Sequence, residues 1–191
     1  MILAVAAATI ILSWQAHSFV PANYAGKVLP PRDSTVDVYL EFTDNGKIVP
    51  LDKNIVRWDV NGKFLAGGEN LKHISFPLDR FTTRSYAVTA TIKNYNDQNV
   101  QKTVIINRAD PLVSLRSSGH EITATPYFFS SPNINDYIFN WIANGISVEN
   151  KLSKLNLALP AGAQPQTVSV GVTASNINNE VLRAFVKYYY L

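Results

Sequence analysis

The sequence contains no cysteine and few charged residues, and both shortages narrow the classes of protein that it can encode. Without cysteine there is no disulfide framework, no cysteine-based metal site and no cysteine nucleophile. Charged residues make up only 16% of the 191 residues, and methionine occurs once. Asn, Thr, Ser, Val and Ile are abundant instead, which favours strands and turns over helices. Export stays open, because a domain without disulfides can rely on its core alone.

Basic residues do not form a run anywhere in the chain. The net charge is +3, with 12 Lys/Arg against 9 Asp/Glu in residues 1–109 and 5 of each in residues 110–191. Binding to nucleic acid depends on neutralising phosphates with clustered Lys and Arg. The sequence therefore predicts an ordinary solvated surface and no nucleic-acid partner.

Residues that carry chemistry do not gather into a motif. The three histidines, His17, His73 and His120, lie in different segments without a partner at metal-ligand spacing. The 14 acidic residues are scattered, which favours solubility over a pair of glycosidase carboxylates. We therefore predict a protein that is not an enzyme, with no catalytic residue, no cofactor and no metal site.

Loop aspartates offer the one alternative to that prediction. Asp44, Asp97 and Asp110 have asparagine neighbours, and such oxygen atoms are the ligands that Ca²⁺ prefers. No Asp-x-Asp-x-Asp spacing occurs, so turn formation is the better explanation. Gly67-Gly68 lacks a following helix or lysine motif and predicts a loop, not a phosphate site.

One pattern occurs twice. Asn61-Gly62 follows Trp58 by three and four residues, and Asn144-Gly145 follows Trp141 at the same spacing. A proline also follows each tryptophan by 19 residues; these are Pro77 and Pro160. Two matching offsets from one anchor predict a tandem repeat, with domains at residues 34–109 and 110–191.

Each repeat alternates apolar and polar residues, which is typical of half-buried strands. Residues 34–42 and 86–92 alternate in the first repeat, and residues 137–141 and 168–174 do so in the second. Turn residues separate these runs every 8–12 positions, a pattern that favours a β-sandwich over a fold of alternating strands and helices. The side chains that we expect in the cores include Phe42, Trp58, Phe76 and Trp141.

A tryptophan strand followed by Asn-Gly and a Val-x-Val-x-Val strand resembles the immunoglobulin-like domains of bacterial surface proteins, the PKD-type domains among them. The resemblance covers residues 34–191. The PKD motif Trp-Asp-Phe-Gly-Asp-Gly stands here as Trp58-Asp59-Val60-Asn61-Gly62, so Asp59 matches its first acidic position. The resemblance implies an extracellular spacer or adhesion module without catalysis.

The first residues, MILAVAAATIIL, are apolar throughout. The run is too short for a membrane helix, which needs about 20 apolar residues. A signal peptide has a hydrophobic centre of about this length, but no Lys or Arg precedes Lys27. We expect residues 1–16 to be an export or anchor segment, either whole or as the truncated end of a longer anchor. The alternative is a buried strand, because Ile10 to Trp14 is rich in β-branched and aromatic residues.

Residues 17–33 contain Pro21, Gly26, Pro30 and Pro31, which forbid a continuous helix or a central strand. We expect a proline-rich extended arm that lies against the first domain.

Aromatic residues are the one surplus, with 9 Tyr, 9 Phe and 3 Trp. Tyr39, Tyr95, Tyr127 and Tyr188-Tyr189-Tyr190 cannot all face inward, because adjacent strand residues point to opposite faces. Exposed tyrosines suit carbohydrate stacking or protein contacts, and cross-strand pairing on a sheet surface is the plainer explanation.

Together these patterns predict an all-β protein of two tandem immunoglobulin-like sandwiches behind a hydrophobic N-terminal segment and a proline-rich arm. We expect a cell-surface or envelope-anchored structural or adhesion module, extracellular, with a protein or glycan partner and membrane association through its N-terminal segment. Two alternatives remain open: a carbohydrate-binding accessory module of an exported hydrolase, and a surface-filament subunit whose N-terminus packs into a neighbour.

Overall fold

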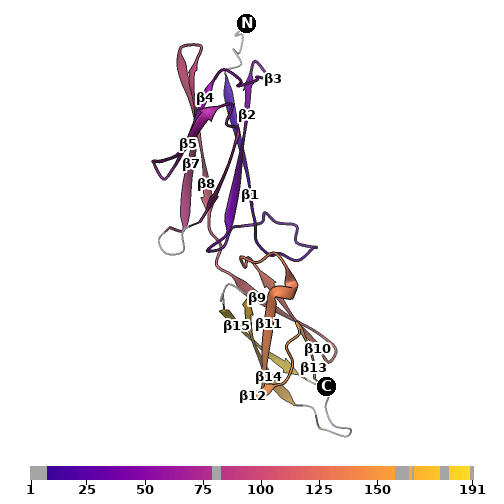
Figure 1. Ribbon diagram of the computed structural model, residues 1–191. Helices are drawn as coiled ribbons and strands as arrows, with labels where there is room; N and C mark the ends of the chain where they lie inside the picture. The colour runs from indigo at the N-terminus through magenta and orange to yellow at the C-terminus, as the bar shows by residue number, and fades with distance from the viewer. Residues whose placement is uncertain (1–7, 79–82, 158–163, 165, 177–180, 190–191) are drawn as a thin grey trace. The chain divides into compact units, whose positions relative to one another are not determined.

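The computed structural model describes residues 8–78, 83–157, 164, 166–176 and 181–189, with the side chains of 183 and 185–189 left aside. Within these residues the chain is all-β, with 15 strands and one 3-10 turn, η1 (Ile134–Asp136) (Figure 1). It divides into two compact units. The first holds Asp33–Arg108 and the residues up to Ala16; the second holds His17–Arg32 and the residues from Ala109 onward.

The first unit is a sandwich of two antiparallel four-stranded sheets. One sheet consists of β1 (Thr9–Ala16), β2 (Thr35–Asp44), β3 (Lys47–Ile48) and β6 (His73–Pro77), with β2 at its centre. The other has the order β5 (Lys63–Glu69), β4 (Ile55–Val60), β7 (Ser85–Tyr95), β8 (Gln98–Asn107). The alternating apolar side chains of both sheets face each other and make the core, as the sequence pattern predicts.

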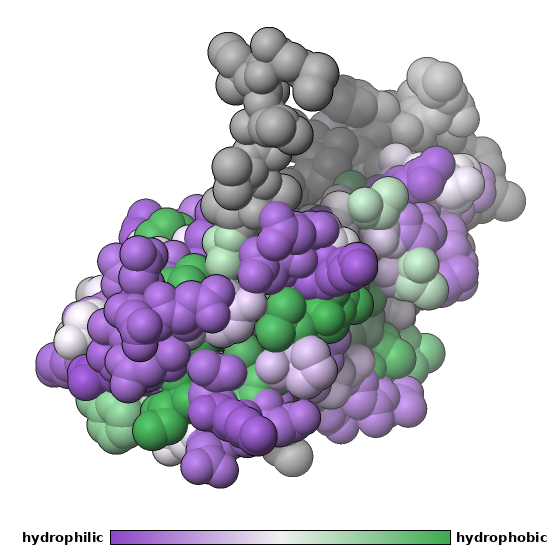
Figure 2. Space-filling view, turned by 90° about the horizontal axis from the view of Figure 1, so that it is seen from above, coloured by the Kyte–Doolittle hydropathy of each residue, from purple (hydrophilic) through white to green (hydrophobic). Residues whose placement is uncertain are grey.

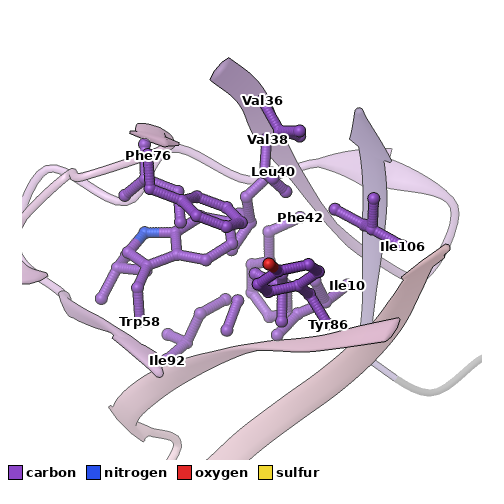
Figure 3. Close-up of a cluster of buried hydrophobic side chains, with 14 of the residues drawn as sticks. Ile10, Val36, Val38, Leu40, Phe42, Trp58, Phe76, Tyr86, Ile92 and Ile106 are labelled. Carbon is purple, nitrogen blue, oxygen red and sulfur yellow. The ribbon is translucent and has the colours of Figure 1, made fainter. Parts of the chain in front are cut away.

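Trp58 lies at the centre of this core with no exposed surface. Figure 3 shows it among the aliphatic and aromatic side chains of both sheets, with Phe76 beside it. Its indole Nε1–H donates a hydrogen bond of 2.8 Å to the carbonyl oxygen of Leu71. The single polar atom of the side chain is therefore satisfied inside the sandwich.

The second unit repeats the arrangement with a three-stranded and a four-stranded sheet. The first sheet has the order β13 (Lys154–Asn156), β10 (Glu121–Tyr127), β9 (Leu112–Ser118). The second has the order β12 (Ile146–Val148), β11 (Tyr137–Ala143), β14 (Thr167–Asn176), β15 (Val181–Tyr189). Trp141 is fully buried here, and its Nε1–H donates to the carbonyl oxygen of Leu152 at 2.8 Å.

The repeated Asn-Gly pairs form the same turn in both units. Asn61 and Gly62 have φ of 50° and 75°, and Asn144 and Gly145 have 49° and 82°, the left-handed values that a tight hairpin needs. The side-chain oxygen of Asn61 accepts from the backbone N–H of Ala87 at 2.9 Å. Asn144 accepts in the same way from Ser169, also at 2.9 Å.

The prediction of two tandem immunoglobulin-like sandwiches is confirmed. Pro160, one end of the second offset, lies outside the described residues.

Thr9–Ala16 is a strand of the first sandwich, so for these residues our preference for an export or anchor segment over a buried strand is wrong. Residues 1–7 of the predicted segment lie outside the described residues. β1 pairs antiparallel with β2 from Thr9 opposite Thr43 to Ala16 opposite Val36. Ile10 is buried, and Leu12, Trp14 and Ala16 pack against the same core. Polar Ser13 and Gln15 face outward between them. No helix among the described residues is long and apolar enough to cross a membrane.

The proline-rich arm belongs to the second unit, not to the first domain as expected. Phe19 exchanges backbone hydrogen bonds with the 128–129 segment, donating to Phe129 at 2.9 Å and accepting from Phe128 at 2.7 Å. Its ring lies 5.3 Å from that of Tyr137. The arm thus closes the core of the second sandwich with its aromatic side chains, a contact that the periodicity of the sequence does not reveal.

Replacing Phe19 with alanine is expected to lower the free energy of unfolding of the second unit by about 1–3 kcal/mol, because a half-buried ring is removed from its core. Urea denaturation measures the loss, and hydrogen exchange should quicken in β10 and β11 but not in β7. Asn23→Ala, an exposed change on the same arm, is the control and should stay within about 0.5 kcal/mol. Wild-type stability of Phe19→Ala would show that the arm does not complete this core.

Candidate functional site

The outer face of β4 carries an ion pair two residues apart on the strand. Arg57 and Asp59 flank the buried Trp58, so both side chains point away from the core. Arg57 Nε donates to the two Asp59 carboxylate oxygens at 2.8 and 3.1 Å, and its Nη2 donates to Oδ1 at 2.6 Å. Several donors on one carboxylate fix the orientation of both side chains.

The pair stays ionised over a wide pH range. The hydrogen bond from Arg57 holds the pKa of Asp59 below its usual value, and the positive charges of Arg57 and Lys93 act in the same direction. The same hydrogen bond and charge raise the pKa of Arg57. The Arg57 side chain is 44% exposed and that of Asp59 is 15% exposed, so water screens the pair and its effect on stability is small.

A β-bulge brings an aromatic ring to this pair. The register between β4 and β5 shifts at Trp58/Asp59, so that Phe64 stands opposite Asp59 and Gly67 opposite Arg57. Both then lie on the outer face, and the Arg57 guanidinium carbon lies 5.2 Å from the centre of the Phe64 ring. Phe64 remains 62% exposed, compared with 41% for Tyr39.

Gly67 leaves room for the Phe64 ring. A Cβ at Gly67 would come within 3.3 Å of Phe64 Cε2, closer than ordinary van der Waals contact. The absent side chain therefore lets the ring approach the sheet. We had predicted a loop at Gly67-Gly68, but β5 runs through both residues to Glu69.

The outer face of the other sheet carries Tyr39, which is 41% exposed. Its ring stacks on His73 with centroids 4.6 Å apart, and His73 Nε2 lies 3.2 Å from Asp37 Oδ1. Tyr39 and His73 are directly opposite each other on β2 and β6. This is the cross-strand pairing that the sequence suggested as the plainer explanation.

The second unit shows which of these features the fold requires. The backbone N–H of Leu40 donates to the carbonyl oxygen of Lys72, the residue before β6, and that of Ala124 donates to Ser153, the residue before β13. When these equivalent bonds are aligned, His73 corresponds to Lys154 and Asp37 corresponds to Glu121. Glu121 and Lys154 also form an ion pair, at 2.9 Å. An acid–base pair at this place is therefore common to both repeats.

The Arg57 cluster has no counterpart in the second unit. With the tryptophans aligned, Arg57 corresponds to Asn140, Asp59 to Ile142 and Phe64 to Ser147. The buried tryptophan, its hydrogen bond and the Asn-Gly turn are present in both units. The residues that differ are therefore not required by the sandwich, which makes the cluster of Arg57, Asp59, Phe64 and Gly67 the candidate functional site.

Tyr95 and Tyr127 are engaged in packing. Tyr95 is half-buried, lies edge-on to Phe42 and donates from its hydroxyl to Asp44 at 2.8 Å, which raises the pKa of Tyr95. Tyr127 is half-buried with Tyr24 of the arm against its ring. Tyr188 and Tyr189 lie on β15 and Tyr190 beyond it, and their side chains are outside the described residues.

Residues considered for metal binding or catalysis stay apart. His17 and His120 belong to the second unit, and His73 belongs to the first. Asp44 ends β2, Asp97 lies in the β7–β8 turn with φ of 61°, and Asp110 lies in the second unit. Over the part of the chain that the structure describes, no three His, Asp or Glu side chains form a group able to hold a metal ion.

A shallow hollow of the first unit is lined by Pro50, Asp52, Lys53 and Asn54. On the face seen in Figure 2, hydrophobic residues form small patches between hydrophilic ones. Because Arg57, Asp59 and Phe64 lie on the outer face of their sheet, ligand contacts at the candidate site would be made on that face.

Comparisons with known proteins give only distant structural likenesses. No family model matches the chain, and no curated protein matches it. A structure of Clostridium thermocellum CbhA fibronectin(III)-like modules is similar over 93% of this chain and 92% of that one, with 11% identity and a TM-score of 0.32. The central fibronectin-III array of RIM-binding protein is similar over 86% and 66%, with 15% identity and a TM-score of 0.31. These neighbours are fibronectin-III-like modules, whereas membership of the PKD type is not confirmed.

Proposed function

We propose that this chain is a non-enzymatic structural and adhesion module, displayed outside the cell or on its envelope, in which two immunoglobulin-like sandwiches support a binding face. The observation that carries the proposal is the placement of the candidate site. Its functional groups extend from an open sheet face, while the interior side chains around Trp58 are used for packing. A face of this kind suits contact with a large surface component better than turnover of a small substrate in a pocket.

Attachment to the envelope through the N-terminus has to use residues that precede Thr9, because Thr9–Ala16 pairs with β2. The filament alternative needs the hydrophobic N-terminal segment to pack into a neighbouring subunit. Ile10 and Leu12 pack into their own sandwich instead. Among the described residues, this leaves no apolar N-terminal strand to donate, so we prefer the adhesion module.

The cellular location tests the proposal. Antibodies against the chain should detect it on intact cells, and protease added to those cells should remove the signal. A cytosolic protein of known location serves as the control for cell integrity. Recovery of the chain only from the cytosol, protected from added protease, would contradict the proposed function.

A further inference from the structure

The Phe64 ring, called the platform below, is held in place by two neighbours, Gly67 and Arg57. The bulge of β5 turns the side chain to the outer face, and Gly67 lets the ring approach the sheet, with 3.3 Å between Phe64 Cε2 and the position of an added Cβ. An exposed aromatic ring in an ordinary pair of strands is free to change rotamer, whereas this ring has Gly67 next to its Cε2 and Cζ atoms and the Arg57 guanidinium over one face. Such a ring is ordered before any ligand arrives.

Directional polar groups lie at the edge of the platform. Asp59 accepts from Nε and Nη2 of Arg57, and a guanidinium carries further N–H donors. A carboxylate offers acceptor sites beyond those that Arg57 uses. The pair therefore presents a fixed donor beside a fixed acceptor, which matches a hydroxyl group that donates and accepts at once.

The size and charge of the site select the ligand. Phe64 and Ile55, which is 52% exposed, share the outer face of this sheet, and the charged residue Glu69 lies opposite Ile55. This apolar area is far smaller than the roughly 1,000 Å² that a specific protein interface buries, but it matches one or two sugar rings. The charges of Arg57 and Asp59 compensate each other, and the negative charge of Glu69 offsets the positive charge of Lys93, so the site does not select for an acidic ligand.

We propose that this face of the first unit binds neutral carbohydrate, with a pyranose ring stacked on Phe64 and its hydroxyls bonded to Arg57 and Asp59. The C–H groups of a pyranose carry small positive partial charges, which the negative face of an aromatic ring attracts. The inference deepens the proposed adhesion function, and it rests on that function for its biological setting. Repeat 2, with Asn140, Ile142 and Ser147 at the matching positions, has no such site.

Calorimetric titration of the purified full chain tests the inference. The probes are cellohexaose, laminarihexaose, xylohexaose and mannohexaose, with the hexamer of galacturonic acid as the acidic comparator. At least one neutral probe should bind, and Phe64→Ala should raise the Kd for that probe by roughly tenfold or more. Phe64→Trp should keep the binding, because it retains an aromatic face. Gly67→Ala should weaken it without removing the ring, because the new methyl group displaces Phe64.

Tyr39→Ala is the matched control, since it removes an exposed aromatic ring from the other sheet. It should leave the Kd unchanged, and all variants should keep the wild-type circular dichroism spectrum. The inference is overturned if no neutral probe binds at millimolar concentration, if the acidic comparator binds more tightly, or if Phe64→Ala binds as the wild type does. Because titration uses purified protein, its failure is separate from failure of the cell-surface experiment.

Discussion

Trp141→Ala is expected to lower the free energy of unfolding of the second unit by about 3–5 kcal/mol, and Trp58→Ala to do the same to the first. Both indoles are fully buried, so each substitution leaves a large cavity at the centre of a sandwich. It also leaves the carbonyl oxygen of Leu152 or Leu71 without its 2.8 Å hydrogen bond. Urea denaturation followed by circular dichroism measures the loss, a large share of the stability of a small domain.

A phenylalanine at either position separates packing from hydrogen bonding. Trp141→Phe keeps an aromatic ring but cannot donate to Leu152, so we expect a loss smaller than that of Trp141→Ala. Hydrogen exchange locates each effect, with faster exchange in β14 for the Trp141 variants and in β7 for the Trp58 variants. Equal stability of Trp141→Ala and the wild type would show that the tryptophan does not fill the core.

The repeat was predictable because it follows from packing. The strand that carries Trp58 also carries inward Val56, and the Asn-Gly pair ends it with positive φ at both residues, a conformation that suits a two-residue hairpin. These local requirements recur wherever the same sandwich is built, so they leave a repeated pattern in the sequence. The alternation of β7 and β14 predicted their buried faces for the same reason.

The first strand and the arm were not predicted correctly, because their partners are distant or lack a pattern. A short apolar run at an N-terminus has the same composition in a signal segment and in a buried strand. The alternation of Leu12, Ser13, Trp14 and Gln15 was the signal for a strand. The arm interrupts the connection from β1 to β2, so the pairing of these strands spans residues 17–34 and escapes any local pattern.

Half of the candidate site was accessible from the sequence. Arg57 and Asp59 flank an inward tryptophan, so alternation places both on the outer face. Phe64 was not accessible, because its orientation depends on the bulge opposite Trp58/Asp59. The sequence predicted a loop at Gly67 because glycine is common in loops. In the structure, the missing side chain of Gly67 instead leaves room for the Phe64 ring.

Substitutions of two adjacent isoleucines, Ile10 and Ile11, test whether the N-terminal segment is a strand of the first sandwich. Ile10→Ala is expected to lower the free energy of unfolding of the first unit by about 2–5 kcal/mol, because Ile10 is 3% exposed and packs into the core. Ile11→Ala should change it by no more than about 0.5 kcal/mol, because Ile11 is 50% exposed on the opposite face of β1. The two variants remove the same atoms from neighbouring positions, so they share their effect on overall hydrophobicity. An apolar export or anchor segment depends on that total and would respond equally to both. A strand of the sandwich distinguishes between its faces, so equal responses in urea denaturation would contradict the placement of β1 against β2.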